Sequence, residues 1–583
     1  MRKLFKYLDT KEKGMAAFSI IFVVIQVWLD LKLPEYMSAI TTLVESPGSQ
    51  ISDILRNGVF MLACAVGSAL ATVVTGYLAA KVAASLSLKL REQLFRHVME
   101  FNSEELGRFS VASLITRATN DVTQVQTLVA MGLQIITKTP IMLVWGLSKI
   151  IGKQWQWTLA TGGMVLLFMV VILLVAVLVL PKFKVIQQLT DDLNRITREN
   201  LSGIRVIRAY NAENYQQQKF EQVNSKLTNN NLFTNRVTGL LMPTMTFIIS
   251  AISLVIYWIG AYLLNGVGMM ERLPVFSDMV VFSQYAMQVI MAFAMLTVLF
   301  VMLPRVIVSV HRINEVLDTK VQIQNGAEQD GIPNVSNIEF RHVSFRYPGA
   351  AENVLEDISF TANRGDTIAI IGATGSGKSS LVNLVPRFYD VTEGEVLVDG
   401  RNVREYEVHA LRKKIGYVSQ KAVLFSGSVV SNITLGKANA DQTKIDTALD
   451  VSQSQEFVSR MPGGVSANIA QGGSNVSGGQ RQRLSIARAI CKNPEIYIFD
   501  DSFSALDYKT DSLLRQALAK KAKDSIKLIV AQRIGTIRHA DRIIVLEDGK
   551  IAGMGTHAEL LESCRVYQEI ARSQLSEEEL KHA

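Results

Sequence analysis

Cysteine is scarce in this chain. Three cysteines occur among its 583 residues, and they lie far apart, at Cys64, Cys491 and Cys564. Their spacing fits neither a C-x-x-C motif nor a disulfide framework, so the sequence excludes a disulfide-stapled secreted fold and agrees with a reducing cytosolic face. No cluster of metal-ligating residues is evident in the sequence either.

The chain also lacks an internal repeat and a surface suited to nucleic acid. Its formal net charge of +8 alone could favour nucleic acid. However, lysine and arginine are concentrated beside long apolar runs, where they set the orientation of a membrane protein. The interleaved aromatic and basic residues of a nucleic-acid-binding surface are not evident. We therefore expect no nucleic-acid partner.

We also expect no cleaved signal peptide at the start of this sequence. The first residues, Met1 to Lys13, are rich in lysine and arginine. The apolar run that follows them is too long for a signal peptide, and no small-residue cleavage site is obvious. We interpret this segment as a cytoplasmic lead into a first membrane span.

Long apolar runs are what the first half of the chain has in abundance. A bilayer is crossed by about 20 apolar residues in a helix. We predict six spans, at 15–38, 57–80, 128–150, 157–180, 240–264 and 277–303. The segments after the second and fourth spans are long and basic, which places them and both termini in the cytoplasm. The sequence thus predicts a multi-pass protein of the cell membrane, with the lipid bilayer as its surroundings.

Two features inside the spans are candidates for substrate contact. Asp30 is an ionisable residue in the first span, and such residues are costly enough to be functional candidates. The alternative is that it lies hydrated near the outer interface, beside Pro34. In the sixth span Met287, Met291 and Met295 recur every four residues. Methionine stripes suit promiscuous binding surfaces, although ordinary helix packing produces them more often.

From about residue 336 the pattern changes to short β-rich runs that alternate with helices, which indicates a layered α/β domain. The fold class is therefore a multi-domain membrane protein, with a six-helix all-α transmembrane domain followed by an α/β P-loop nucleotide-binding domain. We predict the transmembrane domain at 1–305, a connector at 306–335, the nucleotide-binding domain at 336–575 and an acidic tail at 576–583.

A glycine-rich loop carries the strongest motif of the chain. It follows the apolar run 367–371, precedes a helix-like run, and matches G-x-x-x-x-G-K-[ST]. Backbone N–H groups of such a loop hold phosphate oxygens, the lysine adds a charge, and the serine can ligate Mg²⁺. The motif therefore predicts ATP and Mg²⁺ as ligands, the alternative being a glycine-rich turn that binds nothing. Its residues are Gly372, Ala373, Thr374, Gly375, Ser376, Gly377, Lys378, Ser379 and Ser380.

Two further motifs accompany this loop. A buried-type strand at 495–500 ends in Asp500, a position from which a carboxylate can hold the Mg²⁺ of the nucleotide. Between the two lies a glycine-rich turn that opens a helix and forms a second anion site. It consists of Ser477, Gly478, Gly479 and Gln480. Since one ATP does not need two such sites on one chain, we expect a dimer in which this turn closes on the partner's nucleotide.

Together, the six spans and these ordered motifs resemble a type I ATP-binding-cassette exporter half-transporter over nearly the whole chain. The resemblance implies that Tyr347 stacks on adenine and that Gln420 contacts Mg²⁺ and the membrane domain. It also implies a dimer contact at 504–507 and short coupling helices near 110–120 and 209–215.

Two residues depart from the family pattern at positions that act in hydrolysis. The family's water-polarising glutamate is Asp501 here, and its switch histidine is Gln532. A general base must lie about 2.6–3.2 Å from its proton, so a side chain retracted by roughly 1–1.5 Å should slow hydrolysis severely. Glutamine cannot become cationic or bridge through two ring nitrogens. The alternative is drift with full activity.

The departures resemble the degenerate-site subunit of a heterodimeric bacterial multidrug-type exporter. They imply ATP-driven export of amphiphilic or hydrophobic small molecules with a second half-transporter subunit that carries the glutamate and histidine. Turnover would occur mainly at the partner's site, completed in trans by the Ser477 to Gln480 turn. A lipid or peptide exporter of the same fold and a regulatory membrane ATPase that transports nothing remain alternatives. Met1 to Lys13 leaves no room for the Cys/His protease of a peptide exporter that matures its cargo.

Overall fold

The computed structural model describes residues 4–46, 49–151, 154–435 and 441–575, so the acidic tail predicted at 576–583 lies outside the described residues. The chain forms two compact units. The membrane unit comprises 1–99 and 111–318, and the nucleotide-binding unit comprises 100–110 and 319–583. The predicted boundaries near 305 and 335 stay predictions, whereas the contacts divide the chain after Asp318.

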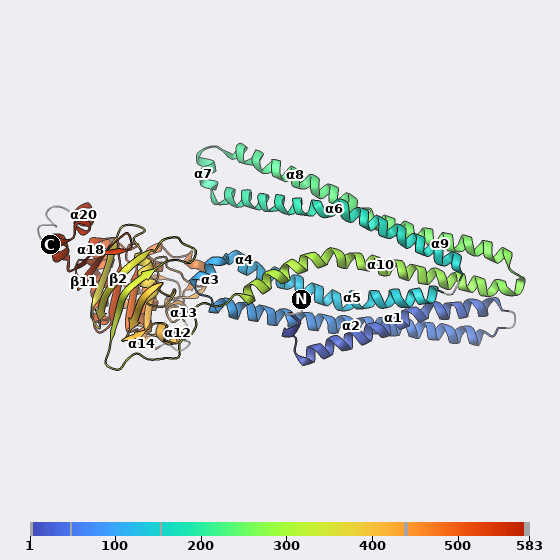
Figure 1. The fold of residues 1–583 in the computed structure, drawn as a ribbon, viewed down its shortest axis with the longest axis horizontal. Helices are drawn as coiled ribbons and strands as arrows, with labels where there is room; N and C mark the ends of the chain where they lie inside the picture. The colour runs from blue at the N-terminus through green and yellow to red at the C-terminus, as the bar shows by residue number, and fades with distance from the viewer. Residues whose placement is uncertain (1–3, 47–48, 152–153, 436–440, 576–583) are drawn as a thin grey trace. The chain divides into compact units, whose positions relative to one another are not determined.

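Helices form the membrane unit, and most of them are long (Figure 1). They are α1 (Thr10–Glu45), α2 (Ile51–Glu100), α4 (Val111–Thr116), the π-helix η2 (Arg117–Asp121), α5 (Val122–Ile150), α6 (Trp155–Ser202), α7 (Ile204–Ala209), α8 (Glu213–Gly239), α9 (Leu241–Gly266) and α10 (Met269–Asp318). A short 3₁₀ turn, η1 (Leu4–Tyr7), precedes them. Among the described residues, six helical segments are long and apolar enough to cross a membrane, as predicted.

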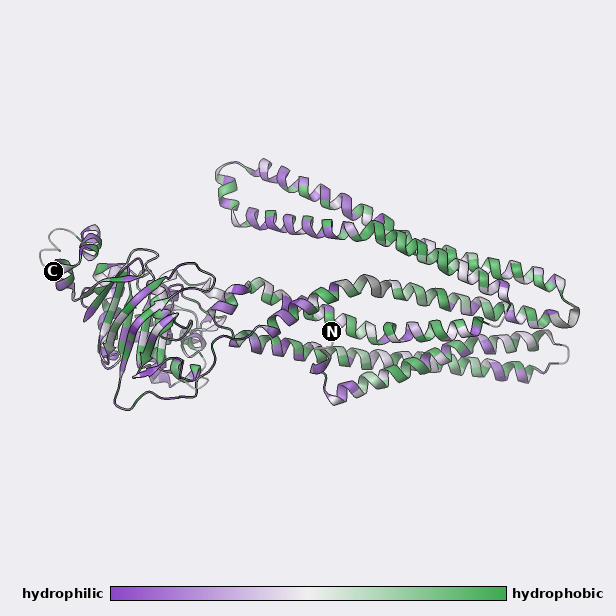
Figure 2. Ribbon diagram, viewed as in Figure 1, coloured by the Kyte–Doolittle hydropathy of each residue, from purple (hydrophilic) through white to green (hydrophobic). Residues whose placement is uncertain are grey.

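Burial differs strongly among these spans. The most apolar window of α6 has a mean hydropathy of 3.4 and is only 11% buried, whereas that of α10 is 50% buried. Trp157, Phe282 and Tyr285 are fully buried in the core that α10 shares with its neighbours. Figure 2 shows α9 largely covered by hydrophobic residues and α8 by hydrophilic ones, since α8 extends a span beyond the apolar region. Helix α10 is therefore the central element of this unit.

In the described part of the second unit the strands form three sheets. Their strands are β1 (Asn337–Phe345), β2 (Leu355–Asn363), β3 (Thr367–Gly372), β4 (Glu393–Val398), β5 (Arg401–Asn402), β6 (Ile415–Val418), β7 (Gly427–Ser428), β8 (Asn468–Ile469), β9 (Ile496–Asp500), β10 (Ile526–Val530), β11 (Arg542–Glu547) and β12 (Lys550–Gly555). The central sheet has the order β12-β11-β3-β10-β9-β6, and all its strands except β12 pair in parallel. An antiparallel sheet, β2-β1-β4-β5, and the pair β7-β8 complete the set.

Short helices accompany these sheets. They are α3 (Ser103–Arg108), α11 (Lys378–Leu384), α12 (Val408–Lys413), α13 (Val429–Ile433), α14 (Gln442–Val451), α15 (Gln455–Arg460), α16 (Gly478–Lys492), α17 (Tyr508–Lys521), α18 (Ile534–Ile537), α19 (His557–Ser563) and α20 (Arg565–Gln574), with 3₁₀ turns at η3 (Gly464–Ser466) and η4 (Gln471–Gly473). The layered α/β domain that the alternating pattern predicts is thus present.

Helix α3 belongs to the nucleotide-binding unit although it lies early in the chain. Its N-cap is Asn102, whose side chain forms a capping box with Glu105. Glu105 is 3% exposed and accepts a hydrogen bond from the backbone N–H of Gln322, at 2.8 Å. Residues 100–110 therefore belong to this unit, and they directly precede the segment where a coupling helix is predicted, near 110–120.

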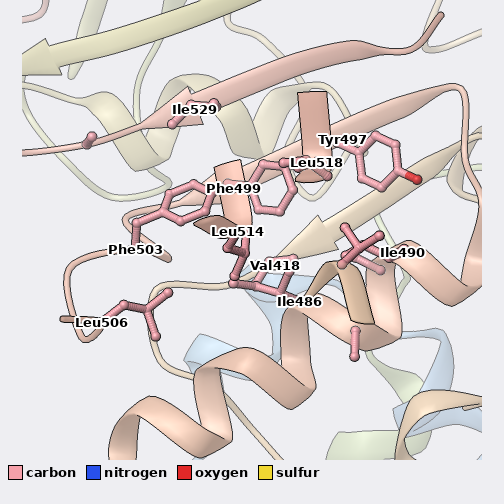
Figure 3. Packing of buried hydrophobic residues seen from close by; sticks show 14 of the residues in the cluster. Val418, Ile486, Ile490, Tyr497, Phe499, Phe503, Leu506, Leu514, Leu518 and Ile529 are labelled. Atoms are coloured by element: carbon pink, nitrogen blue, oxygen red, sulfur yellow. The ribbon is translucent and has the colours of Figure 1, made fainter. Parts of the chain in front are cut away.

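A large apolar core supports the central sheet. Tyr497 and Phe499 of β9 stack with ring centroids 6.0 Å apart and pack between α16 and α17 (Figure 3). Strands β3, β10 and β9 are neighbours, and their register places Ile370, Val530 and Asp500 level with one another. The loops that leave these three strands therefore open at one edge of the sheet, where α/β proteins bind ligands.

Candidate nucleotide-binding site

The predicted phosphate loop connects β3 to α11. Gly375 and Gly377 have φ of 89° and 92°, which other residues rarely adopt. The side chain of Lys378 lies inside the loop, where its amine donates to the carbonyl oxygens of Gly372 at 2.9 Å and Ala373 at 2.6 Å. Burial lowers the pKa of Lys378. Thr374 and Gly375 are exposed at the tip, and Ser376 and Ser380 are buried beneath it. The loop thus holds a cation that an anionic phosphate can neutralise.

Oxygen ligands for a metal lie beside this loop. The hydroxyl of Ser379 donates to Oδ1 of Asp500 at 2.8 Å, which joins the start of α11 to the end of β9. Burial raises the pKa of Asp500, as does the neighbouring charge of Asp501. A cation would offset this cost, and adjacent hydroxyl and carboxylate oxygens are ligands that Mg²⁺ prefers. These residues therefore fit the predicted metal.

The two altered family positions meet at one carboxylate. Oδ2 of Asp501 accepts hydrogen bonds from Nε2 of Gln532 at 2.9 Å and from Nε2 of Gln420 at 3.2 Å. Burial raises the pKa of Asp501. Its backbone is left-handed, with φ of 46°, a conformation that aspartate tolerates better than most residues. The carboxylate is consequently fixed between two amides from different loops.

The predicted adenine contact lies against other aromatic rings. The ring of Tyr347 packs edge-on against Tyr389, with centroids 5.2 Å apart and planes at 89°. Its hydroxyl shares a hydrogen bond of 2.8 Å with the hydroxyl of Ser380. Tyr347 is half-buried and lies directly beside the phosphate loop. The geometry is compatible with a nucleotide whose base lies over this ring.

The Ser477 to Gln480 turn starts α16. The hydroxyl of Ser477 accepts from the backbone N–H of Gln480 at 3.3 Å, and Oε1 of Gln480 accepts from the backbone N–H of Ser477 at 2.9 Å. A β-carbon at Gly479 would lie 3.3 Å from the Ala505 carbonyl oxygen, so the turn and the 504–507 loop are close neighbours. Within the described part of the chain the hydrogen bonds of this turn stay local, and none reaches the phosphate loop.

The substrate candidates lie in the membrane unit. Oδ2 of Asp30 accepts from the amine of Lys138 in α5 at 3.1 Å, and Oδ1 accepts from the hydroxyl of Ser68 in α2. Asp30 is therefore paired within the chain, which explains how α1 carries a carboxylate at this depth. Met291 is 39% exposed, whereas Met287 and Met295 are half-buried, so the three share a helix but not one environment.

Sequence reasoning missed two residues of these sites. The hydroxyl of Tyr417 donates to Oδ1 of Asn383 at 2.9 Å and lies 3.5 Å from Oδ2 of Asp500. Its proximity to Gln420 was a weak signal, because only the fold brings β6 next to β9. Lys138 is a charged residue inside the apolar run 128–150, and that was a usable signal.

Comparison with known proteins agrees with this geometry. A family model for the ABC transporter transmembrane region matches residues 16–293, and one for the ABC transporter domain matches residues 355–504. An uncharacterized ABC transporter ATP-binding protein of Mycobacterium tuberculosis is 40% identical over 534 residues, covering 89% of each chain. The chain belongs to the ABC transporter family. It is an ATP-driven ABC transporter whose nucleotide-binding domain binds ATP and couples its hydrolysis to transport.

A second relative and one solved structure agree with this fold. An ATP-dependent lipid A-core flippase of Pseudomonas fluorescens is 30% identical over 502 residues, covering 86% of this chain and 82% of that protein. The solved structure of a bacterial Atm1-family ABC exporter with ATP bound superposes with a TM-score of 0.81 at 22% identity, covering 98% of this chain and all of the other. The predicted fold class, a six-helix transmembrane domain followed by a P-loop domain, is therefore confirmed as an ABC exporter fold.

Proposed function

We propose that this chain is one half of a heterodimeric exporter and that its own phosphate-loop site retains ATP rather than turning it over. The observation that carries the proposal is the double amide contact to Oδ2 of Asp501. A general base must accept a proton from an attacking water, and here one carboxylate oxygen already accepts from Gln420 and Gln532. Neither amide can take up a proton, so nothing at this position replaces the missing histidine.

Binding residues are intact in this proposal, and only the hydrolytic step is impaired. Lys378 and the loop N–H groups would hold the phosphates, and Tyr347 would contact the base. Ser379, Asp500 and Gln420 would hold Mg²⁺, which neutralises the charge that develops on the transferred phosphoryl group. The carboxylate of Asp501 is held by the amides of Gln420 and Gln532.

The chain's catalytic contribution would then be made in trans. The Ser477 to Gln480 turn presents backbone N–H groups at the start of α16, a helix of 15 residues. Since its hydrogen bonds are local, it is available to close on a nucleotide held by a second half-transporter subunit. Tyr210 and Tyr215, beside α7, are 80% and 67% exposed, which supports a further contact with that subunit.

The substrate class that we propose is amphiphilic or hydrophobic small molecules. Lipid is a second candidate, because several relatives at about this level of identity are named lipid A-core flippases. To separate these, the dimer would be reconstituted in vesicles with a labelled lipid and with a lipophilic dye, each with and without ATP. ATP-dependent movement of dye alone supports a small-molecule exporter and movement of lipid alone a flippase, whereas movement of neither would favour a regulatory ATPase.

The impaired site is tested by restoring the family residues. In the heterodimer, with the partner's phosphate-loop lysine replaced by alanine, we expect Asp501→Glu with Gln532→His to raise ATP turnover by at least about 100-fold, the lower end of what a general base contributes. Asp501→Asn is the matched control and should remain inactive. Rapid ATP turnover by the unaltered chain alone would contradict the proposal.

A further inference from the structure

The C-terminal helix α20 contacts the loop that carries Gln532. Gln574, the last residue of α20, donates from Nε2 to the backbone carbonyl oxygen of Gln532 at 2.8 Å. Its Oε1 accepts from the backbone N–H of Ile534 at 2.9 Å. The amide side chain of Gln574 thus bridges the residues on both sides of Arg533, although Gln574 lies 40 or more residues from them in the chain.

This bridge continues into the nucleotide site. The backbone of Gln532 is held by Gln574, and the side chain of Gln532 donates to Asp501 at 2.9 Å. A line of hydrogen bonds therefore runs from α20 to the carboxylate beside the metal ligand Asp500. Because Gln532 is exposed and follows the end of β10, sheet pairing alone does not fix its position.

Helix α20 is itself firmly anchored. Tyr567 and Ala571 are fully buried in the core beneath the central sheet. The hydroxyl of Tyr567 shares a hydrogen bond of 2.6 Å with Nδ1 of His557 in α19. Gln574 lies one turn beyond Ala571, so it projects from a fixed support onto a loop in which Ala531 and Ile534 are buried but Gln532 is exposed.

We propose that Gln574 is a positioning residue for the loop that carries Gln532, which we call the switch loop. Gln574 holds the backbone of residue 532 where the side chain of residue 532 can reach residue 501. It thereby sets how long this site keeps its nucleotide. The proposal rests on the role proposed above for Gln532. It adds that the C-terminal helix, distant in sequence from every nucleotide motif, controls how long this site keeps its nucleotide.

A purely structural alternative exists, since Oε1 of Gln574 also caps the first N–H of α18. The chain offers a matched control for this. Gln568, also in α20, donates to the carbonyl oxygens of Leu561 at 2.8 Å and Glu562 at 3.3 Å, at the end of α19 and away from the switch loop. Gln574→Ala and Gln568→Ala each remove one side-chain amide of the same helix, together with the two hydrogen bonds that this amide forms with backbone groups.

The experiment measures release of a fluorescent ATP analogue from this chain's site in the full heterodimer, together with amide hydrogen exchange at Ile534. We expect Gln574→Ala to accelerate both by about tenfold, the worth of one ordinary hydrogen bond. Gln568→Ala should leave both unchanged. Gln574→Glu keeps the acceptor for the N–H of Ile534 but cannot donate to the carbonyl oxygen of Gln532. In this variant we therefore expect slow amide exchange at Ile534 together with fast release of the nucleotide.

Equal acceleration of release by Gln574→Ala and Gln568→Ala would overturn the proposal, as would slow release by Gln574→Glu. The result is distinguishable from a failure of the proposed heterodimer role. If the unaltered site proves to hydrolyse ATP rapidly, the proposed function fails. A rate of nucleotide release that depends on Gln574, and not on Gln568, would still identify the positioning residue.

Discussion

Single residues decide what the nucleotide site can do. The amine of Lys378 donates to carbonyl and hydroxyl oxygens, and burial lowers its pKa, so the site is prepared for an anion. Asp501 has the opposite surroundings, because its carboxylate already receives two hydrogen bonds. The first arrangement favours binding, and the second opposes proton transfer.

The ion pair of Asp30 and Lys138 gives a prediction at this scale. Both side chains are 20% exposed. Removing one partner strands the other, so Asp30→Asn or Lys138→Met should each lower the free energy of unfolding by about 2 kcal/mol, less than for a fully buried pair. The double variant should be no less stable than either single one. Thermal unfolding in detergent measures this, and additive losses would show that the pair is not coupled.

The same variant tests the substrate hypothesis for Asp30. If this carboxylate recognises cations, Asp30→Asn should weaken export of cationic dyes more than export of neutral ones. Because Lys138 already occupies the carboxylate, we expect an equal loss for both kinds of dye. Transport into vesicles with paired cationic and neutral dyes measures the ratio, and a selective loss for cations would restore a role in recognition.

Among the elements, helices α19 and α20 are joined by an acid-sensitive contact. Burial, followed by the charges of Arg538 and His539, lowers the pKa of His557. The folded state therefore favours the neutral imidazole, while the unfolded state takes up a proton near pH 6.5. Stability from this contact is present above that pH and is lost as the pH falls toward the lower folded pKa.

We predict that His557→Gln reduces the loss of stability between pH 7 and pH 5. Glutamine can still accept from Tyr567 but does not titrate. The measurement is the unfolding midpoint of the full chain at several pH values, with the exposed His409→Gln as the control. An unchanged pH dependence in His557→Gln would show that other groups determine acid sensitivity.

Elements differ in how well the sequence predicts them. Strand β9 was predicted to within one residue, at 495–500, and β3 covers the apolar run at 367–371, because both are short apolar runs next to a motif. Strand β2 was not predicted, since its burial alternates only from Ile358 onward and its pairing with β1 is irregular. Strand β12 contains Gly553 and Gly555 and lies at a sheet edge, which also weakens the pattern.

The residues of the candidate site also differ in how well the sequence predicts them. Gly372 to Ser380 and Asp500 were identified because a local motif encodes them. The contacts of Lys138 with Asp30 and of Gln574 with Gln532 join segments far apart in the chain. No local period records such contacts, and only the packed structure brings them together.

At the scale of the whole molecule, two units imply two responses to ligand. A ligand that binds only the folded state stabilises it by about 2.7 kcal/mol at 100 times its Kd. We therefore predict that ATP with Mg²⁺ raises the unfolding temperature of the transition that belongs to the nucleotide-binding unit and leaves the other unchanged. Calorimetry measures this. Lys378→Ala and removal of Mg²⁺ by EDTA should each abolish most of the shift, and a shift that survives Lys378→Ala would place the nucleotide elsewhere.

Residues 100–110 belong to the nucleotide-binding unit although the chain on both sides of them belongs to the membrane unit. The backbone consequently passes between the units at 99–100, 110–111 and 318–319. A gene fragment that begins at residue 319 would encode an incomplete domain, in which Gln322 has lost its acceptor on Glu105. A protease that cuts once near residue 319 would leave two polypeptides, and only noncovalent contacts such as that of Gln322 with Glu105 would hold residues 319–583 to the 100–110 segment of the other.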